Sequence, residues 1–292
     1  MKTNKNNKVR IILSLLKTVI LCFFGFICFP IALLLPNWKH YLFVVNTGRS
    51  GSKSFARMFN DENSVYAVHE PYPSMLNFLK LKNRKLKVFN TIIFLFIKYP
   101  KIKILKLIYF NRTTYVESNH MFTYNFMDIA FNLFKYEMKI VRLLRPEHEI
   151  ARSMYNLCAS PDTSLGSVYY SNPNQIIPKK VFEEVVHNCV LKFGPVTKGF
   201  FYALFHCAEI EMKFQSFITK RNTKYIEINM NDINEVETIK SSLFQLLGLQ
   251  LNLTPAILNR KSNEKQERLG RESAREMYVY WKECFSKWDD LS

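Results

Sequence analysis

The stretch YLFVVNTGRSGSKSF, residues Tyr41 to Phe55, decides the predicted fold. Its first five residues form a continuous apolar run of the kind that buried parallel strands show. A turn with two glycines follows, and then Phe55, Met58 and Phe59 recur at the spacing of a helix. The stretch therefore predicts a buried strand, a glycine-containing turn and a helix.

Further strands and helices extend this unit along the chain. Apolar runs predict strands over Ser64–Val68, Met138–Leu144 and Lys224–Met230. Helical patterns fill four later segments: Val181–Val190, Val196–Lys220, Val236–Leu247 and Glu272–Trp288. Strands that alternate with helices indicate an α/β fold with a mainly parallel central sheet. We therefore expect a P-loop-like three-layer sandwich, without internal repeats or a second domain.

Composition narrows the class of protein and of partner. The chain has 292 residues, of which 48% are hydrophobic, enough for a sizeable core. Its 25 Phe and only 8 Gly argue against disorder. The formal net charge of +17 indicates an acidic partner, such as a nucleotide, a polyanionic glycan, a nucleic acid or lipid headgroups.

The N-terminus has the pattern of a membrane anchor. Basic residues precede the apolar run TVILCFFGFICFPIALLL, Thr18–Leu35, which is long enough for a short transmembrane helix. A cleaved signal peptide is the alternative, but this run is longer than a usual signal core and lacks a small-residue cleavage site. Basic residues before the run favour a cytoplasmic N-terminus. We expect residues 1–40 to be a tail and signal-anchor helix, and residues 41–292 to lie in a lumen or outside the cell.

The basic segment Leu79–Phe110 stands apart from the rest of the domain. It contains nine Lys or Arg and no acidic residue, interleaved with apolar and aromatic runs. Such a segment can lie on an anionic membrane surface. The alternative is an insertion whose apolar faces belong to the core and whose Lys side chains are solvated.

Cysteine usage and sequons fit a lumenal domain. Two of the six cysteines lie in the apolar run, and four lie in the domain: Cys158, Cys189, Cys207 and Cys284. One or two disulfides are compatible with this even number, and their pairing stays open. Asn111 to Thr113 is an N-glycosylation sequon. No CxxC or His-rich spacing suggests a metal.

The turn after the first strand is a candidate phosphate site. Backbone N–H groups of a tight turn and of the following helical turn converge on one spot and can bind an anion. The turn differs from a Walker loop, because Ser52 follows the last glycine where that motif has Lys, and this disfavours ATP or GTP. A purely structural turn is the alternative. The candidate ligands are Gly48, Arg49, Ser50, Gly51, Ser52, Lys53 and Ser54.

A second pattern supplies another phosphate site. In RPEHEIARS, Arg145 ends a predicted strand and Ser153 lies eight residues later in the predicted helix. A forked guanidinium and a hydroxyl on one strand–helix unit can hold a phosphate between them. Two such sites suit a nucleotide that carries phosphate at both its 5′ and 3′ positions.

Three segments together resemble a family. TGRSGSKSF looks like the 5′-phosphosulfate loop of sulfotransferases that use 3′-phosphoadenosine-5′-phosphosulfate (PAPS), and RLLRPEHEIARS is similar to their 3′-phosphate motif. RMFNDENSVYAVHEP resembles the segment after the loop in membrane-anchored carbohydrate sulfotransferases. Two positions depart from the pattern, since Arg49 stands where many members have Lys and Lys53 stands where a hydroxyl residue is common.

The resemblance implies an activity and a location. It implies a Golgi enzyme, single-pass and type II, that transfers a sulfuryl group from PAPS to a hydroxyl of a carbohydrate. No metal and no nucleic acid are expected to take part. Arg49 and the amides around Gly51 would neutralise charge on the leaving phosphate, with Lys53 beside them.

The acceptor hydroxyl needs a base, and Glu70 is the first candidate. It matches the Glu-Pro position of the family, and partial burial can raise the pKa of a Glu toward the working pH. His69 is adjacent, but neighbouring strand residues point to opposite faces, so we expect one of the two to be structural. Glu117 and His120, in YVESNH, are candidates for acceptor binding, and the alternative for Glu117 is a surface position.

Other functions stay open. A nucleotide-dependent phosphoryl-transfer enzyme would need a strand-end Asp for magnesium, and neither Asp128 nor Asp232 lies at such a place. Tyrosylprotein sulfation would also suit a basic surface. A non-catalytic module that binds polyanions or anionic lipid would explain the charge, but not the serine-rich loop together with Arg145 and Ser153.

Overall fold

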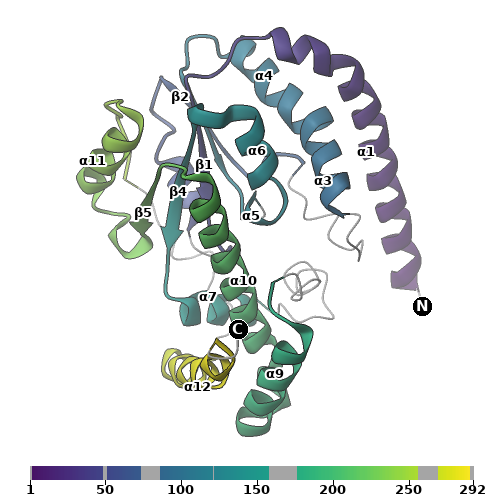
Figure 1. The fold of residues 1–292 in the computed structure, drawn as a ribbon, viewed down its shortest axis with the longest axis vertical. Helices are drawn as coiled ribbons and strands as arrows, with labels where there is room; N and C mark the ends of the chain where they lie inside the picture. The colour runs from purple at the N-terminus through teal and green to yellow at the C-terminus, as the bar shows by residue number, and fades with distance from the viewer. Residues whose placement is uncertain are drawn as a thin grey trace.

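A parallel sheet of five strands forms the centre of the molecule, and helices cover both of its faces (Figure 1). The structure is a computed structural model of the chain, and it describes residues 2–48, 51–73, 86–120, 122–157, 176–255 and 269–289. The strands are β1 His40–Val45, β2 Val65–His69, β3 Thr114–Ser118, β4 Met138–Leu144 and β5 Tyr225–Asn229.

Helices connect and surround these strands. Apart from α-helices there is a short π-helix, η1, and three 3₁₀ turns, η2 to η4, in the described part of the chain. In chain order the helices are α1 Lys2–Leu34, α2 Ser52–Arg57, α3 Leu86–Ile93, η1 Phe94–Lys98, α4 Tyr99–Ile108, α5 Phe122–Asn125, α6 Met127–Phe134, η2 Lys135–Glu137, α7 Glu147–Asn156, α9 Lys179–Phe193, η3 Pro195–Thr197, α10 Lys198–Arg221, η4 Met230–Asp232, α11 Val236–Leu247 and α12 Arg271–Asp289.

The strand order creates a crevice in the middle of the sheet. The order is β2-β3-β1-β4-β5, and every described pair of neighbouring strands is parallel. The chain leaves β1 toward β2 on one side and leaves β4 toward β5 on the other. In open α/β sheets, ligands bind at the carboxyl ends of two neighbouring strands whose following connections leave in opposite directions. The topology therefore directs attention to the ends of β1 and β4.

Alternation along the strands gives the sheet two apolar faces. Tyr41, Phe43 and Tyr115 point into a core shared with η1, α4, α5 and α6. Leu42 and Val44, their neighbours on β1, point into a core on the other face, which α2 and α11 cover. The expected three-layer α/β sandwich with a parallel sheet is confirmed.

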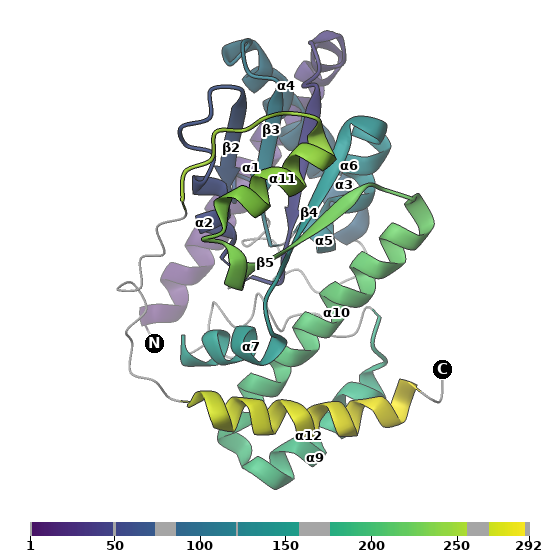
Figure 2. The same cartoon turned by 90° about the vertical axis from the view of Figure 1, so that its left-hand side faces the viewer.

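A third core lies beyond the carboxyl edge of the sheet. There α7, α9, α10 and α12 pack together, around Phe205 and Trp281 among others. Figure 2 shows these helices gathered below the sheet, with α10 running up from them along one face. This base holds the first turns of α7 directly beneath the crevice.

The predicted strands and helices agree closely with the structure, and one strand was missed. The four expected strands and the four expected helices all form, and the strand bounds agree to within one residue. Strand β3, Thr114–Ser118, was not expected. Its sequence, TYVES, contains Glu117, which was considered for acceptor binding or a surface position and not as part of a central strand.

Helix α1 lies against the domain and does not stand apart from it. The rings of Phe26 and Phe29 pack on Phe96 of η1, at centroid distances of 5.4 and 5.6 Å. A Cβ atom at Gly25 would lie 1.3 Å from the carbonyl oxygen of Phe96, so only glycine allows this close approach. Within the described residues, no helix combines the length and apolar composition needed to cross a bilayer.

The basic insertion is only partly described, because residues 79–85 lie outside the described residues. The remainder forms α3, η1 and α4, and Phe94 and Ile102 belong to the core. Its Lys side chains are not all solvated. Lys103 is buried and donates to Asn37 Oδ1 at 2.6 Å, while Lys98 is buried beside the sheet. The segment therefore has one face in the core and another at the surface.

The domain cysteines are free thiols wherever they are described. Cys189, Cys207 and Cys284 are buried and form no disulfide. Cys158 lies outside the described residues. Burial raises the pKa of Cys189 to about 12, and the neighbouring Cys284 adds to that shift.

Candidate active site

The turn after β1 is shaped by an asparagine and two glycines. Buried Asn46 accepts a hydrogen bond on Oδ1 from the backbone N–H of Gly48 at 2.9 Å, which closes a tight turn. Gly48 and Gly51 have φ values of 79° and 80°, a conformation that favours glycine. A Cβ at Gly51 would lie 2.1 Å from Cε of Met230, so the turn also packs closely on the end of β5.

The structure describes only part of the expected phosphate loop. Arg49 and Ser50 lie outside the described residues. Ser52 is buried, and its carbonyl oxygen accepts a hydrogen bond from the hydroxyl of Ser118 at 3.0 Å. Ser54 is half-buried and Lys53 is exposed. The bond to Ser118 ties the beginning of α2 to the carboxyl end of β3.

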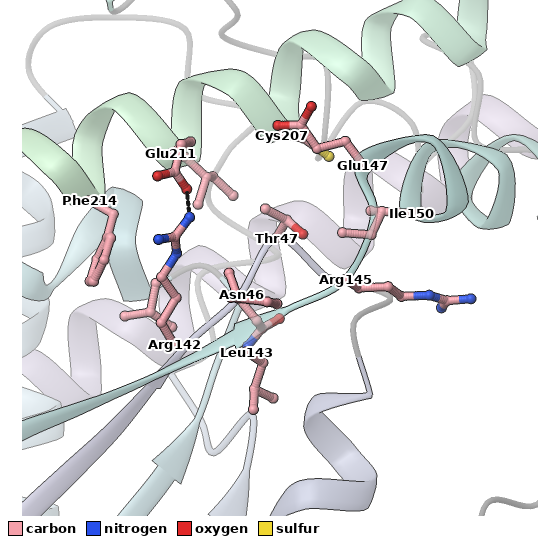
Figure 3. Close-up of a pocket in the computed structure, with 13 residues that line it drawn as sticks. Asn46, Thr47, Arg142, Leu143, Arg145, Glu147, Ile150, Cys207, Glu211 and Phe214 are labelled. Atoms are coloured by element: carbon pink, nitrogen blue, oxygen red, sulfur yellow. Dashed lines mark hydrogen bonds and ion pairs between the residues drawn. The ribbon is translucent and has the colours of Figure 1, made fainter. Parts of the chain in front are cut away.

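The expected 3′-phosphate residues lie on one strand–helix unit. Arg145 follows β4, and Ser153 lies half-buried in α7. Arg145 donates from Nε to Glu149 Oε2 at 3.0 Å, an ion pair one helical turn apart. In Figure 3 the Arg145 side chain points away from Thr47 and the crevice. Glu149 therefore orients this guanidinium, and a bound phosphate would have to share it.

A small cavity lies at the crevice between β1 and β4 (Figure 3). Its volume is about 70 Å³, room for a few water molecules and far less than a nucleotide needs. It is lined by Asn46 and Thr47 after β1, by the end of β4 and by α10. Arg142 in its wall forms ion pairs with Glu211 and, at 2.5 Å, with Glu227. The cavity marks the inner end of the crevice.

Glu70 follows the last residue of β2 and has an unusual backbone conformation. Its φ is 47°, in the left-handed region that residues other than glycine rarely adopt. Its backbone N–H still donates to the carbonyl oxygen of Ser118, at 2.8 Å, so the strand pairing with β3 holds it there. Unusual backbone angles of this kind cluster at functional sites.

This conformation brings Glu70 together with two histidines. Oε1 of Glu70 lies 2.5 Å from Nδ1 of His120 and 3.7 Å from Nε2 of His69. The expectation that His69 and Glu70 point to opposite faces is wrong, because strand alternation ends at the left-handed Glu70. His120, expected to bind the acceptor, is instead the direct partner of the candidate base.

The pKa of Glu70 shifts in the direction opposite to the one expected. Burial raises the pKa of Glu70, but the hydrogen bond from His120 and the charges of His120 and His69 outweigh burial and hold it below its ordinary value. Burial lowers the pKa of His69, and the charges of His120 and Lys53 add to this against the opposing effect of Glu70. At neutral pH the Glu70 carboxylate is therefore ionised beside a neutral His69. Lys53 lies close enough for its charge to lower the pKa of His69.

Glu117 is not a surface residue, contrary to one reading of the sequence. It is fully buried, and its Oε1 lies 2.6 Å from Nζ of Lys98 in η1. The hydroxyl of Tyr115 donates to Oε2 at 2.8 Å, and the amide of Asn119 donates to Oε1 at 3.1 Å. Both carboxylate oxygens of Glu117 thus have partners within the protein. Glu117 lies three residues before His120 in the sequence.

Helix α10 also reaches the crevice, which the sequence did not indicate. The pKa of His206 is lowered to about 3, mainly by burial and also by the charges of His120 and Lys213, against a hydrogen bond to the backbone of Thr47. His206 therefore lies close to the turn after β1 and to the partner of Glu70. The only sequence signal was a histidine in an otherwise apolar helical stretch, which is more often a core residue.

Metal ligation has no support in the described part of the chain. No group of three or more His, Cys, Asp or Glu side chains is placed there to hold a metal ion. The acidic residues weighed for magnesium lie elsewhere. Asp128 is exposed in the first turn of α6, and Asp232 is exposed at the end of η4.

Comparison with solved structures gives distant likenesses only. A solved structure described as a sulfotransferase from Alicyclobacillus acidocaldarius is similar with a TM-score of 0.44 and 10% sequence identity, over 86% of this chain and 94% of that one. No protein family and no curated protein matches the sequence. This likeness is too distant to assign the chain to a family.

Proposed function

We propose that the chain is a PAPS-dependent sulfotransferase that acts on a carbohydrate hydroxyl. The observation that carries the proposal is the meeting of several groups at one carboxyl edge of the sheet. The glycine turn follows β1, Arg145 follows β4, and the pair of Glu70 and His120 follows β2 and β3. Anion-binding groups and a candidate base thus flank the same crevice.

The donor would bind across the ends of β1 and β4. Backbone N–H groups of the turn around Gly51 would bind the 5′-phosphosulfate, and Arg145 with Ser153 would hold the second phosphate. Arg49 would stabilise negative charge as it builds on the leaving phosphate. Lys53, exposed and near His69, is placed to add to that charge stabilisation.

PAPS supplies the activated sulfuryl group, and this chain supplies the base. Glu70 accepts the proton of the acceptor hydroxyl while the hydroxyl oxygen forms its bond to sulfur. The bond between sulfur and the bridging oxygen breaks, and its electron pair leaves with the 5′-phosphate of 3′,5′-adenosine diphosphate. His120 holds the Glu70 carboxylate in place through the 2.5 Å contact to Oε1.

The low pKa of Glu70 suits a base that must be ionised before the reaction. A carboxylate with a lowered pKa is always ready to accept a proton, although it attracts that proton less strongly. The contact with His120 is one cause of that lower basicity, and it also fixes the position of the carboxylate.

Calorimetric titration tests the donor assignment. We expect 3′,5′-adenosine diphosphate to bind more tightly than ATP or a heparin-like glycan. Arg145→Ala should weaken binding of the bisphosphate by roughly 10- to 100-fold, the contribution of a charge-assisted contact. Arg57→Ala, an exposed Arg in the last turn of α2, is the matched control and should bind normally. Tight ATP binding without a response to the bisphosphate would overturn the proposal.

We further propose that the domain works on the lumenal side of the Golgi membrane. The resemblance of its motifs to those of membrane-anchored carbohydrate sulfotransferases supports this location. Protease treatment of sealed vesicles checks it, since a lumenal domain survives until detergent opens the membrane. Digestion in intact vesicles would place the domain in the cytosol instead.

A further inference from the structure

The helical layer beside the sheet presents a large apolar surface to its surroundings. It consists of α1, α3, η1 and α4, which contact one another and lie side by side in Figure 1. The described residues include 23 exposed large hydrophobic side chains. Of these, 15 lie on the four helices and one, Phe110, lies just after α4. We call them the apolar face: Leu16, Val19, Ile20, Phe23, Phe24, Phe26, Ile27, Ile31, Leu33, Leu34, Val88, Ile92, Ile104, Leu107, Ile108 and Phe110.

The apolar face is continuous because α1 is fixed to the domain. Leu21, Cys22 and Phe29 of α1 pack inward on the core, which turns the opposite side of the helix outward. Outward residues are strongly exposed, for example Phe23 at 64% on α1 and Ile108 at 62% on α4. A monomeric soluble protein rarely leaves apolar patches of such extent uncovered.

Charge around the apolar face identifies what covers it. The four helices contain no Asp or Glu, while Lys17, Lys101 and Lys106 lie among them. A surface that is both apolar and basic matches acyl chains and anionic headgroups. A second copy of the chain would instead bring the same positive charges against these.

The apolar face adjoins the candidate base. Tyr72 lies two residues after Glu70, and its ring lies 5.0 Å from Nζ of Lys17 on α1. Its carbonyl oxygen accepts a hydrogen bond from Nζ of Lys101 on α4, at 3.0 Å. The segment that carries Glu70 is thus held directly against both helices, at the level where headgroups would meet the basic side chains.

We propose that the apolar face docks on a bilayer that contains anionic lipids, and that the acceptor hydroxyl belongs to the sugar headgroup of a lipid in that bilayer. Docking buries the outward side chains of α1 and α4 among acyl chains. It leaves Glu70 facing the headgroup layer. The docking does not depend on the proposed sulfuryl transfer, whereas the nature of the acceptor rests on it.

Vesicle flotation tests the docking with the full-length chain. We expect wild type to float with phosphatidylcholine vesicles that contain phosphatidylserine, and less with phosphatidylcholine alone. Ile108→Asp should lower the partition into vesicles by roughly tenfold or more, because it places a carboxylate among lipid chains. Leu191→Asp is the matched control, since Leu191 on α9 is at least as exposed as Ile108 and lies outside the apolar face. Equal flotation of the two variants would overturn the docking surface.

Transfer assays then test the acceptor. With labelled PAPS, wild type should modify a glycolipid in vesicles faster than the same sugar free in solution. Ile108→Asp should lose most of this preference and keep its rate on the free sugar, as Leu191→Asp keeps both. A wild type without preference for the vesicle-bound sugar overturns the lipid acceptor and leaves the proposed function standing. Absence of transfer to either sugar overturns the proposed function, while flotation still decides the docking.

Discussion

Two carboxylates at the ends of adjacent strands have opposite surroundings. Glu117 on β3 is fully buried, and Lys98, Tyr115 and Asn119 hold both of its oxygens. Glu70 after β2 keeps a quarter of its side chain exposed, and His120 contacts its Oε1. The same functional group therefore serves as an internal anchor in one position and faces the crevice in the other.

The comparison teaches what separates a structural carboxylate from a reactive one. An acceptor hydroxyl can reach only the carboxylate that is exposed, whatever charge the other carries. The buried pair of Glu117 and Lys98 fixes the end of β3, and the residues just after that end present His120 to Glu70. The two carboxylates are thus neighbours with separate tasks, and three experiments test this division.

The largest effect is expected from Glu70→Gln. The amide keeps the size of the side chain but cannot accept the proton, so transfer from labelled PAPS should fall by roughly 10²- to 10⁴-fold. Stability and affinity for 3′,5′-adenosine diphosphate should be almost unchanged. His69→Gln is the control and should cost far less activity. If the His69 variant is inactive and the Glu70 variant active, His69 is the base.

Glu117→Gln should act on stability. Breaking a buried ion pair leaves Lys98 without its counter-charge, and the free energy of unfolding should fall by about 3–5 kcal/mol. Urea denaturation measures the loss. The double variant Lys98→Met with Glu117→Gln should recover a large part of it, because neither charge then remains buried. Unchanged stability in the single variant would mean that the pair does not anchor β3.

The smallest effect is a shift in pH dependence for His120→Asn. Ionised Glu70 is needed for transfer, so the rate falls as pH drops through the pKa of Glu70. His120 contributes to holding that pKa below its ordinary value, against burial, which raises it. Loss of the ring should therefore move the acid limb of the rate profile to higher pH. A limb that stays in place, or moves to lower pH, would exclude His120 as the partner that tunes Glu70.

Local patterns predicted much of the fold. The run YLFVV and the glycine turn after it indicated β1 and α2, because continuous apolar runs and glycine spacing are local signals. Strand β3 escaped, since its Glu117 is stabilised by Lys98, a residue 19 positions away on a separate helix. A buried charge is paired through tertiary contacts, and the sequence around it gives no sign of its partner.

The site was predictable only in its parts. The resemblance of motifs pointed to Glu70, and the YVESNH cluster pointed to His120, yet nothing linked residues that lie 50 positions apart. The direction of the pKa shift depended on that link, because burial alone would have raised the pKa of Glu70. The left-handed backbone at Glu70 was also hidden, since glycine usually occupies such positions.

The strand order has a consequence for biosynthesis. Strand β1 pairs with β3 and β4, and the nearer of these, β3, begins about seventy residues after β1 ends. At about 5–20 residues per second, a ribosome needs several seconds to supply that partner. During this interval YLFVV emerges as an unpaired apolar edge, which is prone to aggregate. Slower elongation before residue 114 prolongs that exposure, so the yield of folded protein should depend on codon choice in this interval.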